Sequence, residues 1–228
     1  MVERHSSVPS SPFDASDHQR FGRAFVLSAE GSVERQIIEA AKQHAAEHGW
    51  ASTTMDDLAA ASSLSRATIY RAFPGGRETV IEAVRRHSVL EFFHELQPVL
   101  ESCDELVDAI STTMVTAVRM LDDDEQLQRE LEQDPGQVLP AISFRGVDRI
   151  VVVARVFMAP SLMAFVSRRD ANRAAEWAAR MVLSYYFDPS PHLDLRDEAA
   201  VATFVRRRLV PGLASHSLSS DPRHQELI

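Results

Sequence analysis

The chain has 228 residues, and the 45% that are hydrophobic are ample for a packed core in one large domain or in a small head joined to a larger body. Its single cysteine, Cys103, excludes an internal disulfide and a cysteine-based zinc cluster. The N-terminal letters MVERHSSVPSSPFD lack a signal peptide's apolar run, and no stretch is long and charge-free enough to span a bilayer. We therefore expect a soluble, cytoplasmic chain with no membrane partner. Only 8 Gly, with plentiful Ala and Leu, favour helix over sheet.

The net charge of −9 is divided unevenly along the chain. Residues 1–90 carry 10 Lys and Arg against 11 Asp and Glu, whereas residues 91–228 carry 14 against 22. Because the local charge decides whether a surface meets DNA phosphates, the acidic total does not exclude a nucleic-acid partner. A near-neutral N-terminal part predicts modest non-specific affinity and reliance on dimerisation.

Residues 1–31 are rich in Ser, Pro and charge, so we expect a mobile N-terminal arm. Arg20 and Arg23 could instead reach a minor groove of DNA, although a loose tail is the simpler interpretation. After the arm, Ser32 can cap a helix that runs to about His48 and has Val33 on its inner face.

Residues 54–73, TMDDLAAASSLSRATIYRAF, are typical of two short helices joined by a tight turn. Thr54 is a good N-cap for the first helix, Ser63 lies in the turn, and Ser65 can cap the second helix. In that second helix Ile69 points to the core, which leaves the opposite side free to contact a partner.

That free side carries short or planar side chains with hydroxyl and guanidinium donors, which suit base edges and phosphates. We therefore predict that the second helix enters the major groove of double-stranded DNA, although a hairpin that merely packs is an alternative. After the break at residues 74–76, Arg77 begins a long helix and can bind phosphate. The predicted DNA-binding residues are Thr54, Ser65, Arg66, Ala67, Thr68, Tyr70, Arg71 and Arg77.

The segment from Glu34 to about Arg86 resembles the DNA-binding head of the TetR family of transcriptional regulators. The matching letters are IIEAAKQHAAEHGW and TTMDDLAAASSLSRATIYRAFPGGRETVIEAV. The resemblance implies an all-α fold, with a three-helix helix-turn-helix DNA-binding head at residues 32–76. A larger helical bundle at 77–214 would bind a small effector and form a homodimer, and residues 215–228 would be a flexible tail.

Three positions depart from the family pattern. Ser63 stands where the family commonly has glycine, so the turn must reach its geometry without glycine's freedom. Ala72 stands where a histidine or another donor is common, and it cannot hydrogen-bond phosphate. A glycine pair and Arg77 replace the usual lysine at the start of the long helix.

Prolines, glycines and capping residues mark the expected ends of the helices in the body. The first long helix is expected from Arg77 to near Leu96, ending before Pro98, and Asp104 can cap the next one. The acidic run at 122–125 suits a solvated turn better than a calcium site, and a short helix follows over 126–132, stopped by the Pro-Gly pair at 135–136. Residues 144–166 are apolar nearly all round, so a helix there should be buried, with a kink at Pro160.

The resemblance places an effector cavity beside that buried helix, where adaptable and broad side chains suit a lipophilic small molecule. An ordinary filled core is the alternative for each of them. The candidate effector-binding residues are Phe92, Phe93, Met114, Val118, Phe157, Met158, Met163 and Phe165.

The last two long helices, expected at 171–187 and 195–213, resemble the paired C-terminal helices by which many members of the family dimerise. A two-fold interface repeats one patch on both subunits and sets the spacing of the two recognition helices. The candidate interface residues are Ala174, Trp177, Ala178, Met181, Tyr185, Val201, Val205 and Leu209.

No catalytic motif stands out. His44 and His48 share one helix face, but two ligands without a third make a weak metal site, so we expect no metal and no cofactor. The sequence therefore predicts a non-enzymatic, ligand-responsive transcriptional repressor that binds an operator as a homodimer and is released by an effector. The alternative is a helical small-molecule-binding or scaffolding protein whose head does not bind DNA.

Overall fold

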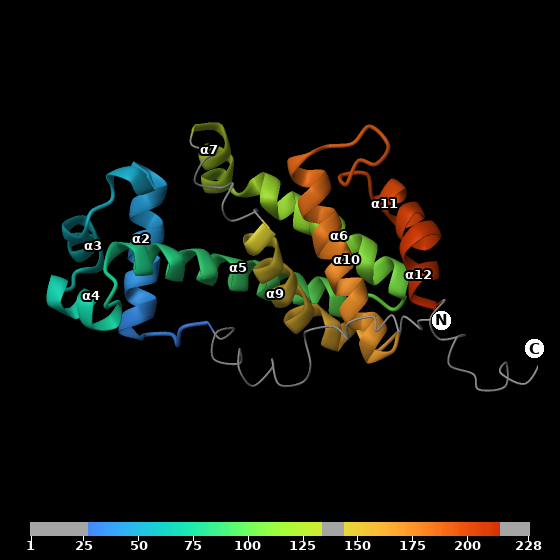
Figure 1. The fold of residues 1–228 in the computed structure, drawn as a ribbon, viewed down its shortest axis with the longest axis horizontal. Coiled ribbons are helices and arrows are strands. Elements are labelled where there is room, and N and C mark those ends of the chain that lie inside the picture. Colours follow the sequence, from blue (N-terminus) through green and yellow to red (C-terminus); the bar gives the residue numbers. More distant parts are fainter. Residues whose placement is uncertain (1–26, 134–143, 215–228) are drawn as a thin grey trace, which may run out of the picture.

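The computed structural model describes residues 27–133 and 144–214, which are largely helical and form no β-strand. A three-helix head lies at one end of the molecule, and the long helix α5 leads from it into a larger bundle (Figure 1). Most of the predicted N-terminal arm, including Arg20 and Arg23, lies outside the described residues, as do the Pro-Gly pair at 135–136 and the tail 215–228.

The head begins as its capping residues predict. The Ser32 hydroxyl accepts a hydrogen bond from the Arg35 backbone N–H at 3.1 Å, and the helix ends where Gly49 takes a φ of 78°. The inner face holds Ile37 and Ile38, whereas Val33 at the first position is exposed, which corrects the predicted face. The elements of the head are α2 (Val33–His48), the short 3₁₀ helix η1 (Trp50–Ser52), α3 (Met55–Ser62) and α4 (Arg66–Ala72).

The turn between α3 and α4 reaches its geometry with a serine in the left-handed region. Ser63 has φ 55° and ψ 30°, and its backbone N–H donates to the Ala60 carbonyl at 3.2 Å. This conformation costs free energy for a residue with a Cβ atom, whereas glycine adopts it freely. The departure noted in the sequence is therefore accommodated by local backbone strain.

The body consists of α5 (Arg77–Glu101), α6 (Leu106–Asp123), α7 (Glu125–Gln133), α9 (Phe144–Leu162), α10 (Arg168–Phe187), α11 (Glu198–Phe204), a π-helical turn η2 (Val205–Leu209) and α12 (Val210–Ala214). Three predicted boundaries are corrected. Helix α5 continues through Pro98 because Leu96 and Leu100 are both buried in the core. Glu105, not Asp104, occupies the N-cap position of α6, and α9 ends at Leu162, two residues after Pro160.

Helix α5 belongs to both hydrophobic cores. Its first turns contribute Val80 and Val84 to the core of the head, and its later turns contribute Leu90, Phe93 and other residues to the core of the body. The two cores are therefore joined by one continuous helix. No helix among the described residues combines the length and apolar character that a bilayer span needs.

We expect Ser63→Gly to raise the free energy of unfolding by about 0.5 to 1 kcal/mol, because glycine removes the strain of the left-handed turn. The matched control is Ala60→Gly, which introduces the same residue at an exposed interior position of α3 and should lower stability by about 1 kcal/mol. Urea denaturation measures both variants. A Ser63→Gly protein less stable than the parent would contradict the strain account.

Candidate DNA-binding face and effector cavity

One side of helix α4 packs in the core of the head, and the opposite side faces the solvent. Ile69 is fully buried in the core of the head, and the Ser65 hydroxyl caps the helix by accepting the Thr68 backbone N–H at 3.1 Å. On the opposite side Tyr70 is 44% exposed and Arg71 is exposed as well. The structure thus brings most of the predicted DNA-binding residues onto one exposed flank, comprising Thr54, Ser65, Arg66, Ala67, Tyr70 and Arg71, with Thr68 half-buried beside them.

Acidic side chains at the start of α3 adjoin this flank. Arg66 Nη1 lies 3.0 Å from Asp56 Oδ1, so one of the predicted DNA contacts is already paired within the head. The Thr54 hydroxyl donates to Asp57 Oδ2 at 2.6 Å, and together with the Thr54 backbone N–H this bond lowers the pKa of the Asp57 carboxyl. Thr54 therefore has a structural role in capping α3 besides any contact with DNA.

The Arg77 side chain links the start of α5 to the rest of the head through hydrogen bonds. Its Nε donates to the Thr53 carbonyl at 2.7 Å, and its Nη2 donates to the Trp50 carbonyl. These bonds tie the first turn of α5 to the loop between α2 and α3. Its predicted phosphate contact stays a prediction, because most of the guanidinium is occupied by these backbone carbonyls and by Glu78.

Gly76 brings the recognition flank close to the start of α5. It has a φ of 67°, and a Cβ atom at this position would lie 3.1 Å from the Tyr70 ring. The glycine therefore lets the backbone approach the aromatic ring and supports it from one side. The Tyr70 ring therefore lies close to Gly76 on one side, while 44% of the residue is exposed.

A cavity of about 510 Å³ lies in the body and reaches the head. Its walls come from α5, α6, α7, α9 and α10, and Lys42 of α2 contributes from the head side. Most of the lining is apolar, with Phe92, Phe93, Met114 and Met158 among the wall residues. A volume of this size is typical of small-molecule pockets.

Those four side chains are half of the predicted effector set, and the other four do not line the cavity. Val118 is fully buried in the core, and Phe157 packs against the Phe93 ring at 6.4 Å between centroids. Met163, 49% exposed, and Phe165 lie beyond the end of α9, where the chain turns. The sequence pattern predicted that this helix continues to residue 166. Because α9 ends at Leu162, Met163 and Phe165 do not belong to a helix face beside the cavity.

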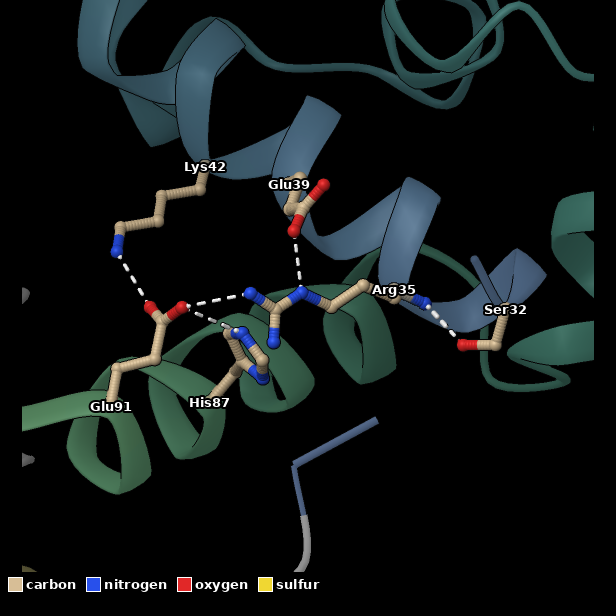
Figure 2. Close-up of polar contacts among 6 residues, drawn as sticks. All are labelled: Ser32, Arg35, Glu39, Lys42, His87 and Glu91. Carbon is tan, nitrogen blue, oxygen red and sulfur yellow. Dashed lines mark hydrogen bonds and ion pairs between the residues drawn. The ribbon is translucent and has the colours of Figure 1, made fainter. Parts of the chain in front are cut away.

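A polar cluster joins α2 to α5 (Figure 2), and two of its residues, Lys42 and Glu91, line the cavity. Glu91 of α5 receives a hydrogen bond from Lys42 Nζ at 3.0 Å and another from Arg35 Nη2 at 3.2 Å, and both donors come from α2. Burial alone would raise the pKa of the Glu91 carboxyl, but the hydrogen bond and the charge of Lys42, together with the charge of Arg35, lower it. Glu91 is therefore ionised and holds the head against the body.

His87 lies beneath this cluster and is almost fully buried. Its Nε2 is 3.1 Å from Glu91 Oε1, but the approach lacks hydrogen-bond geometry, so this nitrogen has no hydrogen-bond partner in the part of the chain that is described. Burial lowers the pKa of His87 more strongly than the neighbouring carboxylate raises it. The imidazole is consequently neutral at pH 7.

Sequence reasoning missed this cluster. His87 and Glu91 are four residues apart on one helix, and Arg35 and Lys42 are seven apart on another, so each pair shares a helix face. That spacing was the available signal. It does not say which two helices face each other, because the pairing depends on how α2 crosses α5.

The predicted dimer residues fall on two different faces. Ala174, Ala178, Val201, Val205 and Leu209 are buried inside the protomer, so they cannot form an interface, and this part of the prediction is corrected. Trp177, Met181 and Tyr185 are half-buried and lie four residues apart on the neighbouring face of α10. The sequence pattern merged the inward alanine stripe with this outer stripe, because the two are adjacent on the helix.

Comparisons with known proteins address the head first. Residues 37–84 match the model of a family described as bacterial regulatory proteins, tetR family. The chain is similar in structure to the TetR family repressor AlkX from Dietzia sp. strain DQ12-45-1b, which is implicated in biodegradation of n-alkanes, with a TM-score of 0.60 and 22% identity over 82% of this chain and 98% of that chain.

A further similar structure is a TetR-family transcriptional regulator from Pectobacterium atrosepticum, with a TM-score of 0.49 and 19% identity over 82% of this chain and 91% of that chain. No curated protein matches the sequence. The likeness to AlkX supports the all-helical fold of head and body, which agrees with the predicted fold class.

The lowered pKa of His87 predicts how stability depends on pH. The unfolded chain binds a proton near pH 6.5 and the folded chain only at lower pH, so the free energy of unfolding should fall as pH drops from 7.5 to 5.5. His87→Gln should flatten this slope, whereas the control His94→Gln, an exposed histidine of the same helix, should keep it. Urea denaturation at several pH values measures the slopes. Equal slopes for the parent and His87→Gln would show that the lowered pKa of His87 is not the cause of the pH dependence.

Proposed function

We propose that this chain, whose residues 37–84 match the model of the tetR family of bacterial regulatory proteins, is a ligand-responsive transcriptional regulator acting as a repressor. It binds a (pseudo)palindromic operator as a homodimer and is released by a small lipophilic effector. The observation that carries the proposal is α4, whose rear is locked by the buried Ile69 and whose front is an exposed polar flank. A helix held in this way can enter a major groove without reorganising the head.

Within the flank, Arg71 and Tyr70 are the proposed principal contacts. Arg71 is exposed near the end of α4, and its guanidinium can bind a guanine edge or a phosphate. The Tyr70 hydroxyl can donate to phosphate, while its ring is supported at Gly76. Ala67 has a small side chain that permits close approach of the helix backbone to the groove floor.

The homodimer is proposed to form through the outer face of α10. Trp177 is anchored there by Arg173, whose guanidinium carbon lies 4.6 Å from the ring centroid. With Met181 and Tyr185 it forms a half-buried stripe of broad apolar side chains, the residue types enriched at interfaces. A two-fold axis near this stripe would repeat the same patch on both subunits.

Effector control is proposed to pass through α5. The cavity is lined by α5 residues from Ser88 to Leu96, and the same helix supplies Val80 and Val84 to the core of the head. A ligand that binds better to one arrangement of α5 shifts the population of head positions by that difference in affinity. The apolar walls favour a lipophilic effector.

The alternative proposal is a helical small-molecule-binding or scaffolding protein whose head does not bind DNA. A specific observation favours it, since Arg66 is paired with Asp56 and Arg77 is bonded to backbone carbonyls, while Ala72 offers no phosphate contact. The salt dependence of binding to the chain's own upstream DNA separates the two, because phosphate contacts release counterions and a scaffold would show no slope.

We expect Arg71→Ala to weaken specific operator binding about tenfold or more and to reduce the salt slope by about one unit. Tyr70→Ala should weaken binding as well. Fluorescence anisotropy on labelled operator at several salt concentrations measures both effects, and Arg119→Ala, an exposed arginine of the body, is the control for lost charge. Unchanged binding by both head variants would show that α4 is not the recognition helix.

A companion variant should have the opposite sign. Asp56→Asn frees Arg66 and removes a negative charge beside the flank, so operator affinity should rise roughly two- to fivefold.

The interface assignment predicts that Met181→Arg converts the dimer into monomers and lowers operator affinity, since a charge on the apolar stripe would be buried at the two-fold axis. Gln43→Arg, the same residue introduced at an exposed position of α2, should leave the oligomeric state unchanged. Sedimentation velocity gives the masses. Dimers of unaltered stability in the Met181→Arg protein would mean that another surface forms the interface.

A further inference from the structure

We propose that the cavity takes an amphipathic cation, an apolar chain carrying an ammonium or guanidinium group, and that the cation acts by competing with Lys42 for Glu91. This inference rests on the proposed function and names the ligand class of the same cavity. It is carried by a juxtaposition of the described residues, since Glu91 both lines the cavity and binds two basic residues of the head.

The cavity wall sets the first requirement. Side chains of α5, α6, α9 and α10 supply an apolar lining, including Phe93, Met114 and Met158. Such a lining binds an alkyl or aromatic body by removing it from water and gives no charge preference by itself.

The polar residues around the cavity determine which charge on a ligand is favoured. Among its described lining residues, Lys42 is the one base, against the carboxylates of Glu91, Glu95, Asp123 and Asp124. Asp124 is engaged as the cap of α7, where its Oδ1 accepts the backbone N–H of Gln126 and Leu127. Glu95 and Asp123 are exposed and have no ion pair within the described part of the chain.

The helix ends near the cavity do not decide the sign of the potential. Helix α6 ends at Asp123 and α7 begins at Glu125, so a negative and a positive helix end adjoin each other. The carboxylates therefore set the preference, because they attract a positive ligand group and repel an anion.

Glu91 connects ligand charge to the position of the head. Its two oxygens are occupied by Arg35 and Lys42 of α2, and the Lys42 side chain is nearly half exposed, so it can be displaced without unpacking a core. A ligand cation at Glu91 replaces Lys42 and removes one of the polar ties between α2 and α5. Helix α7 makes a second tie at the same place, because Arg129 donates to the Ala46 carbonyl of α2 while Leu127 lines the cavity.

The experiment compares three probes with the same alkyl chain, namely decyltrimethylammonium, decanol and decanoate, each below its micellar concentration. Isothermal titration calorimetry of the full chain at low salt should give the tightest binding for the ammonium, about tenfold tighter than for decanol, with decanoate weakest. Glu95→Gln combined with Asp123→Asn should reduce that preference by lowering the affinity for the ammonium, and should leave decanol affinity unchanged. Glu82→Gln, a carboxylate of α5 outside the cavity, is the matched control.

Lys42→Met tests the competition directly. Without its competitor the ammonium should bind several-fold tighter, whereas an anion-binding site would lose affinity for decanoate. Decanoate binding tightest and weakening in Lys42→Met would overturn the proposal, as would equal affinities for the three probes or no binding of any. Operator binding by the ligand-free protein is measured separately. A chain that binds operator but no amphiphile overturns this inference alone, and one that binds the ammonium but no operator overturns the DNA-binding function alone.

Discussion

The structure depends on one constraint, that a single helix of 25 residues belongs to two hydrophobic cores at once. Because protein interiors are close-packed, α5 cannot shift against either core by small continuous steps without losing contacts. A displacement of its later turns by a ligand in the body must therefore reach Val80 and Val84 in the head. Glu91 lies at the start of these later turns, one residue after Leu90, where its polar contacts with α2 can exchange partners at lower cost than a core can be repacked.

The uneven distribution of charge between head and body is compatible with the proposed DNA-binding role of this acidic chain. The excess of carboxylates lies in the body, while the head is near neutral and several of its basic groups have internal partners. One head therefore offers limited charge to phosphates, so the proposed DNA binding would need two heads with fixed spacing for useful affinity. In that proposal, specificity would rest on the shape and donors of α4 more than on bulk electrostatics.

Much of the head could be predicted from sequence, because its signals are local. The caps Ser32, Thr54 and Ser65 bond to the backbone as expected, and the left-handed Ser63 follows from the missing glycine. The body was harder, because burial overrides local signals. Buried leucines carry α5 through Pro98, and α10 has an inward alanine stripe next to the outer stripe of Trp177, which a helical repeat cannot separate. The cavity and the Glu91 cluster depend on how distant helices cross, and no spacing in the sequence encodes that.

The most direct test of the account measures the distance between the two heads. A nitroxide label on Glu47→Cys, an exposed position of α2, in a Cys103→Ser background gives one spin per protomer for pulsed dipolar spectroscopy. We expect a defined distance distribution that operator DNA retains and narrows, and a displaced distribution when a ligand saturates the cavity. Identical distributions in the operator-bound and ligand-bound samples, or no coupling between spins at all, would contradict control of head spacing by the body.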